Sequence, residues 1–167
     1  MRKWKVSKTI QWIIKLFIIY LCMFTAFRIA TVILFKPKNI SVLELAPSFW
    51  LGLKYDLRWI AIVLSPIIVL SIFKKFSPFH SARTKKAWTI YLAIITLVIM
   101  FFYGADFGNF SYNHTRIGAS ALNFKDDPYE MFRMVWESYP IVWILIGLGI
   151  AVFFAAQLFR RTHGTVD

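Results

Sequence analysis

Cysteine and acidic residues are scarce in this chain of 167 residues, and each shortage excludes a class of protein. Its single cysteine, Cys22, cannot form a disulfide framework or a cysteine metal site within one chain. Only 17% of the residues are charged and 59% are hydrophobic, which is more apolar surface than a soluble domain of this length could bury. The net charge is +12, but the basic residues bracket apolar runs and do not line one face, which argues against nucleic-acid binding.

Charge is missing altogether from two stretches, Ala87–Ala105 and Ser138–Phe159. At a rise of about 1.5 Å per residue, each is long enough to cross a hydrocarbon layer of about 30 Å as a helix. Two further apolar runs, at about 10–35 and 49–73, contain a few charges. We therefore predict an all-α integral membrane protein with a single transmembrane domain, whose four spanning helices lie at about residues 10–35, 49–73, 87–105 and 140–159.

The basic residues also predict an orientation, because Lys and Arg are retained on the cytoplasmic side of a membrane. If the N-terminus is inside, eleven of the 20 basic residues lie in cytoplasmic segments and five in outer segments. The remaining four lie within the first two predicted helices. The predicted topology therefore has four helices, with the N-terminus and the C-terminus both inside.

The only long polar stretch, 106–138, lies between the third and fourth predicted helices. Asp127 followed by Pro128 is typical of a helix start, with Asp127 as the N-cap. We predict a short amphipathic helix in the membrane interface at about 128–138. The alternative is a plain connector with no binding role. The helix would place charged residues on one stripe (Glu130, Arg133, Glu137) and aromatic residues on another (Tyr129, Phe132, Trp136, Tyr139).

Three residues of the same stretch, Asp106, His114 and Arg116, are predicted to form an outer polar cluster. A carboxylate and an imidazole there are candidate ligands for a cation or a phosphate. One of each does not make a metal site, so the alternative is a hydrogen-bonded cluster at the interface.

Five charged residues fall inside the first two predicted helices, where each needs a partner or water. Lys15 lies near the cytoplasmic end and can reach the headgroup layer, which leaves Arg28, Lys54, Asp56 and Arg58. Arg28 and Asp56 each lie seven residues inside the outer end of their helix, about 10 Å below the same surface, so we predict an ion pair between them. Lys54 and Arg58 share a face that is rotated by about 200° from Asp56. Their charges suit a lipid phosphate. The alternative is a structural ion pair with two bases that reach to the headgroup layer.

Several short motifs follow one another along the chain: a basic N-terminus, GLKYDLR at 52–58, FYGADFGNF at 102–110 leading into Arg116, and WESYP at 136–140. In this order they resemble the N-terminal membrane domain of the lipoteichoic acid synthase family, also described as phosphoglycerol transferases or membrane sulfatase-like proteins. In that family, five membrane helices precede an extracytoplasmic domain of the alkaline-phosphatase type. A metal-bound threonine in that domain takes phosphoglycerol from phosphatidylglycerol.

The chain departs from this pattern because it contains four predicted helices and none of the catalytic domain. No catalytic or metal-binding residue can be carried over, and we expect no catalytic residue, metal or other cofactor in these 167 residues. A divalent metal would belong to the missing domain. The resemblance thus implies an N-terminal piece, or a remnant or split version, of a larger enzyme, which needs a fifth helix to place a domain outside.

Two functions from different classes remain open. The first is the membrane-anchoring module of a lipid-headgroup phosphotransferase in the bacterial cytoplasmic membrane, with membrane lipids, including anionic phospholipid, as partners. A separate catalytic chain or a second copy of this chain would then be a further partner. The second is a stand-alone membrane scaffold that binds partner helices and has no substrate.

Overall fold

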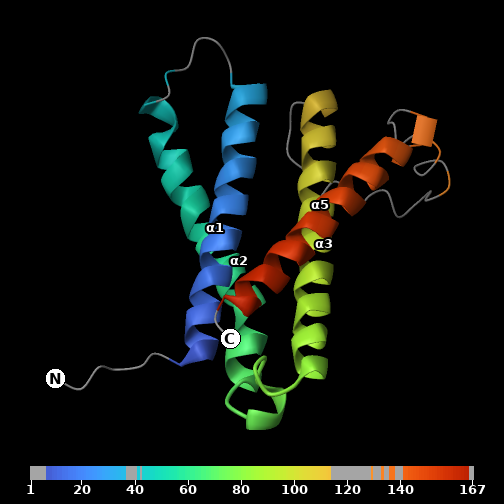
Figure 1. The fold of residues 1–167 in the computed structure, drawn as a ribbon. Coiled ribbons are helices and arrows are strands. Elements are labelled where there is room, and N and C mark those ends of the chain that lie inside the picture. Colours follow the sequence, from blue (N-terminus) through green and yellow to red (C-terminus); the bar gives the residue numbers. More distant parts are fainter. Residues whose placement is uncertain are drawn as a thin grey trace. The chain divides into compact units, whose positions relative to one another are not determined.

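The computed structural model describes residues 7–36, 41, 43–113, 129, 133, 136, 137 and 141–165. Within these residues there is no strand, so the all-α part of the prediction is confirmed (Figure 1). Three helices are long and apolar enough to cross a membrane, as expected of a membrane-associated protein. They are α1 (Lys8–Phe35), α3 over Ala82–Ser111, and α5 (Ile141–Gly164). The elements are α1 (Lys8–Phe35), the short 3-10 helix η1 (Leu43–Leu45), α2 (Ala46–Leu70), a second one, η2 (Lys74–Phe76), α3 (Ala82–Asn113) and α5 (Ile141–Gly164).

The chain divides into two compact units, Met1–Leu92 with Ala156–Asp167, and Ala93–Ala155. The first unit holds α1, α2, the first turns of α3 and the last turns of α5. In the second unit, the described residues belong to the remaining turns of α3 and α5, together with four helical residues at 129, 133, 136 and 137. Arg133 donates a hydrogen bond of 2.9 Å to Glu137 one turn later. The rest of the predicted interfacial helix lies outside the described residues.

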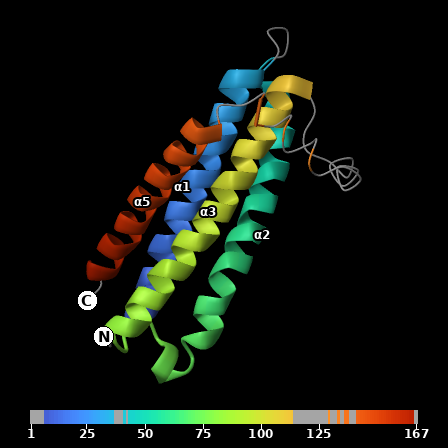
Figure 2. The ribbon, with the colours of Figure 1, turned by 90° about the vertical axis from the view of Figure 1, so that its right-hand side faces the viewer.

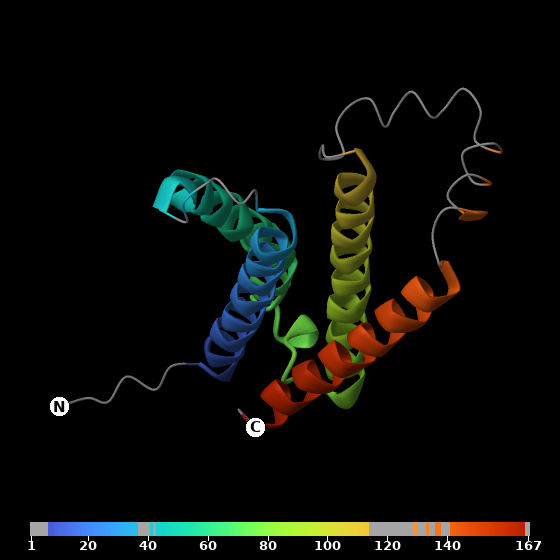
Figure 3. The ribbon, with the colours of Figure 1, turned by 90° about the horizontal axis from the view of Figure 1, so that it is seen from above.

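In the first unit, α1 and α2 lie side by side and run in opposite directions (Figures 1 and 3). Residues at spacings of three and four share one face of a helix, and both helices bury such a stripe. α1 buries large side chains at every fourth position, and α2 buries aliphatic residues together with one carboxylate. The buried residues are Trp12, Leu16, Tyr20 and Phe24 on α1, and Asp56, Ile60, Val63, Leu64 and Ile67 on α2.

α2 continues across Pro66 without ending. Proline has no N–H, so the carbonyl of Ile62, four residues earlier, loses its helical donor. The hydroxyl of Ser65 donates to that carbonyl oxygen at 2.9 Å. The hydroxyl of Tyr91 on α3 donates to the next carbonyl, that of Val63, at 3.0 Å. Side-chain donors of this kind let a proline persist within a helix, because they give the nearby carbonyls other hydrogen-bond donors.

The connection from α2 to α3 runs through η2 (Figure 2). Ser81 caps α3 reciprocally with Thr84: its hydroxyl accepts from the Thr84 N–H at 3.2 Å, and its own N–H donates to the Thr84 hydroxyl at 3.1 Å. α3 therefore begins at Ala82, before the predicted start at Ala87. Basic side chains limit an apolar run, but they do not limit a helix, because Lys and Arg are good helix formers.

The other helix limits also differ from the predicted spans. α3 continues through Asp106 to Asn113, and α5 continues through two arginines to Gly164. α2 spans Ala46–Leu70 where 49–73 was predicted.

Candidate functional site

The centre of the candidate site is Arg28 on α1, whose guanidinium reaches across to α2. It forms a salt bridge with the carboxylate of Asp56, through Nη2 and Oδ2. Its Nη1 donates a hydrogen bond of 2.7 Å to the backbone carbonyl of Phe49. The same guanidinium lies 5.9 Å from the centroid of the Phe49 ring. The structure thus brings together the two residues whose equal depth predicts an ion pair.

α2 presents Phe49, Gly52 and Asp56 to this guanidinium, at positions i, i+3 and i+7 of one helix face. A Cβ added at Gly52 would lie 2.5 Å from the Cζ of Arg28 and 2.6 and 2.8 Å from its two terminal nitrogens. The guanidinium therefore lies directly against the backbone of α2, where any side chain would displace it. Sequence reasoning identified both charges of this pair, but it did not predict the roles of Gly52 and the Phe49 carbonyl.

The pair is largely shielded from the surroundings, with 19% of the Arg28 side chain and 7% of the Asp56 side chain exposed. Because the two opposite charges are in contact, the site is nearly neutral. A charge at membrane depth is expensive unless it is paired, and each of these charges satisfies the other.

Lys54 and Arg58 lie on the exposed side of α2, away from this pair. Each cation contacts an aromatic ring of its own helix: the Lys54 ammonium is 5.4 Å from the Trp50 ring, and the Arg58 guanidinium is 5.8 Å from the Tyr55 ring. Among the described residues, neither has an acidic partner. The structure therefore separates the four charges into one neutral buried pair and two exposed cations.

The aromatic rings that these two cations contact are exposed, and so is Trp59, the residue after Arg58. Trp50 is 62% exposed, Tyr55 54% and Trp59 56%. Exposed Trp and Tyr side chains gather at the level of lipid headgroups, where an apolar ring meets a wet surface. The same side of α2 thus offers both a cationic pair and the aromatic setting of a membrane interface.

The predicted outer polar cluster is described only in part. Asp106 lies in α3, within the second unit. His114 and Arg116 lie outside the described residues, so the cluster stays a prediction. In the part of the chain that the structure describes, no group of three His, Cys, Asp or Glu residues could hold a metal ion. Cys22 is free and exposed there.

A second cluster, which sequence reasoning missed, joins the end of α5 to α1 and to the turn before α3. The Nε2–H of His163 donates a hydrogen bond of 2.9 Å to the carbonyl oxygen of Pro78. The imidazole is buried, at 2% exposure, against Phe79 at 4.3 Å and Trp12 at 5.4 Å between ring centroids. One turn earlier on α5, Phe159 stacks on Tyr20. Phe159 and His163 are four residues apart and so share one face of a helix, which could have indicated that both belong to this cluster. The predicted helix ended at about residue 159, before the histidine.

Comparisons of this chain with models of protein families, with curated proteins and with solved structures find no match. A function must therefore be argued from the charges of α2 and their surroundings.

Proposed function

We propose that this chain is the membrane-anchoring module of a lipid-headgroup phosphotransferase similar to the lipoteichoic acid synthases, which transfer phosphoglycerol from an anionic lipid. In this proposal it is a multi-pass protein of the bacterial cytoplasmic membrane, with four spanning helices and both termini in the cytoplasm. The catalytic residues and a divalent metal would belong to an extracytoplasmic domain. The role of these residues is to hold that domain at the surface and an anionic lipid beside it.

The observation that carries the proposal is the separation of charges on α2. Arg28 compensates Asp56, whereas Lys54 and Arg58 are exposed without an acidic partner among the described residues. Cations at membrane depth need a counter-ion, and the anion available beside an exposed helix face is a lipid phosphate. Guanidinium and ammonium groups both bind phosphate through charge-assisted hydrogen bonds.

The same separation supports a fourth span. By composition, α2 is not among the helices apolar enough to cross a membrane, since it carries Lys54, Asp56 and Arg58. Pairing with Arg28 removes the only acidic charge of α2 from contact with lipid. From the predicted outer end of the span at Phe49, Lys54 and Arg58 lie about 8 and 14 Å along the helix. Helical side chains point toward the N-terminus, so both long side chains extend toward the outer headgroup layer.

Lipid binding tests the local part of the proposal. The full chain is purified in neutral detergent, and its binding of phosphatidylglycerol and phosphatidylcholine is measured by native mass spectrometry. Lys54→Gln with Arg58→Gln should weaken the binding of one phosphatidylglycerol per chain at least tenfold and leave the melting temperature unchanged. The matched control, Arg160→Gln with Arg161→Gln, removes the same charge and should bind like the parent. Equal binding by both double variants would contradict the proposed headgroup contact.

A chimera tests the function itself. Residues 1–167 replace the first four membrane helices of a lipoteichoic acid synthase, ahead of its own fifth helix and catalytic domain, in a strain that lacks this enzyme. We expect phosphoglycerol polymer to form, and less of it when Lys54 and Arg58 are neutralised. A chimera that reaches the surface but makes no polymer, beside an active one built from another family member, would favour the scaffold.

A further inference from the structure

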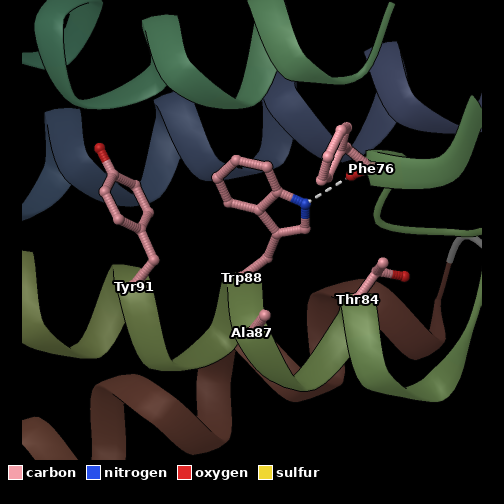
Figure 4. Close-up of a pocket in the computed structure, with 5 residues that line it drawn as sticks. All are labelled: Phe76, Thr84, Ala87, Trp88 and Tyr91. Atoms are coloured by element: carbon pink, nitrogen blue, oxygen red, sulfur yellow. Dashed lines mark hydrogen bonds between the residues drawn. The ribbon is translucent and has the colours of Figure 1, made fainter. Parts of the chain in front are cut away.

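A shallow groove lies on the first unit, where η2 meets the first turns of α3. It has a volume of about 250 Å³ and is lined by Phe76 of η2 and by Thr84, Ala87, Trp88 and Tyr91 of α3. Figure 4 shows the Trp88 indole between the Phe76 and Tyr91 side chains.

The walls of the groove are held by hydrogen bonds. The Trp88 indole N–H donates to the carbonyl of Phe76 at 2.8 Å, which ties α3 to η2. The Tyr91 hydroxyl donates to the carbonyl of Val63 on α2 at 3.0 Å, and the Thr84 hydroxyl donates to the carbonyl of Ser81 at 2.8 Å. The polar atoms of these lining residues are thus occupied, and the groove presents mainly aromatic and aliphatic carbon.

Two exposed bases lie beside the groove and are called its rim here. Arg83 lies one turn before Ala87 on the same side of α3, and Lys75 is next to Phe76 in η2. The chain has no acidic residue between Asp56 and Asp106, so no neighbour in the sequence supplies a counter-charge. An apolar floor with a cationic rim is complementary to a molecule with an apolar chain and an anionic head.

We infer that this groove binds an anionic phospholipid, with part of an acyl chain against Trp88 and Ala87 and the phosphate among the rim bases. The volume is smaller than that of a typical small-molecule pocket, about 300–1,000 Å³, and suits a length of acyl chain. Two exposed apolar residues, Ile72 at 76% and Phe73 at 60%, come just before η2 in the chain. Basic pockets between membrane helices are known to bind anionic headgroups. This lipid site is separate from Lys54 and Arg58, and the inference needs no catalytic domain.

Photo-crosslinking tests this site in the full chain. A phosphatidylglycerol that carries a diazirine on one acyl chain is irradiated with the purified protein in mixed micelles, and the labelled peptides are identified by mass spectrometry. We expect labels within residues 76–91. Glycerophosphoglycerol, the deacylated headgroup, and inorganic phosphate should not compete, whereas unlabelled phosphatidylglycerol should.

Two kinds of variant separate the groove from its charges. Ala87→Leu fills the groove at an exposed helical position and should reduce the labelling of 76–91, while Ala82→Leu, outside the groove, should not. Lys75→Gln with Arg83→Gln should weaken the lipid affinity read from the labelling of 76–91 about 25-fold, since each base near a lipid phosphate contributes about a factor of five. The control Arg160→Gln with Arg161→Gln should leave it unchanged.

Several results would overturn the inference. Equal labelling by a diazirine phosphatidylcholine would show an apolar surface without charge recognition. Competition by inorganic phosphate would show a free-anion site. Unchanged labelling in both Ala87→Leu and the Lys75 and Arg83 double variant would place the lipid elsewhere. Loss of binding in the Lys54 and Arg58 double variant, with 76–91 still labelled, would leave this site intact and concern only the proposed function.

Discussion

Removing one partner of the Arg28–Asp56 salt bridge should destabilise the α1–α2 hairpin far more than removing a neighbouring exposed charge. Truncation of one partner in a buried ion pair costs about 3–5 kcal/mol, because the other charge is left uncompensated. Here the carboxylate side chain is 7% exposed and the guanidinium 19%, so either charge left alone would be largely buried. We expect a loss of about 3 kcal/mol in the free energy of unfolding for Asp56→Leu.

Other substitutions in and beside the pair should lower the free energy of unfolding by smaller amounts. Asp56→Asn retains an oxygen that accepts from Arg28, so its loss should be about 2 kcal/mol. Lys54→Gln, two residues away on the exposed side of α2, should lie within about 0.5 kcal/mol of the parent. The double variant Arg28→Met with Asp56→Leu removes both charges, and it should lie within about 1 kcal/mol of the parent because no unpaired charge remains.

The measurement is reversible unfolding in mixed micelles of increasing SDS fraction, followed by circular dichroism. The cycle of parent, Asp56→Leu, Arg28→Met and double variant gives a coupling energy between the two residues. It should be at least about 2 kcal/mol, because Asp56→Leu alone costs about 3 kcal/mol and the double variant at most about 1 kcal/mol. The reasoning would be refuted if Asp56→Asn were no less stable than Lys54→Gln. It would equally be refuted if the double variant lost the sum of the two single losses.

Three further predictions concern the packing, the topology and the chemistry. Gly52→Ala should destabilise the protein by about 1–3 kcal/mol in the same assay, although alanine favours a helix, because its Cβ would overlap the Arg28 guanidinium; a gain in stability would contradict that packing. In a Cys22→Ala background in intact cells, an impermeant thiol reagent should label Ser120→Cys and spare His80→Cys, and the reverse pattern would overturn the predicted orientation. The purified chain should not hydrolyse phosphodiesters or sulfate esters with any added divalent metal, and metal-dependent turnover that survives purification would refute this.

The hydrophobic pattern by itself determined that this chain is helical and membrane-associated. Runs of about twenty apolar residues have few other stable states in a lipid layer, because only a helix satisfies its own backbone within one segment. Counting residues along such helices also brought Arg28 and Asp56 to one depth, since the rise per residue is constant. The pair could therefore be predicted without any knowledge of tertiary contacts.

The limits of the helices could not be determined in the same way. The apolar pattern ends where the surroundings become polar, whereas a helix ends where its hydrogen bonds find another partner. Thus α3 begins at the Ser81 cap, and α5 continues to Gly164. This difference hid His163 from sequence reasoning, because it lies beyond the apolar run.

Only the tertiary structure decided which atoms meet. The contact of the Arg28 guanidinium with the backbone at Gly52 depends on how closely two helices approach, and no local pattern encodes that distance. The cluster of Trp12, Phe79 and His163 joins residues about 150 positions apart in the chain. Periodicity reports the face of each helix that is apolar, but the partner of that face is chosen by the shapes of side chains from distant parts of the chain.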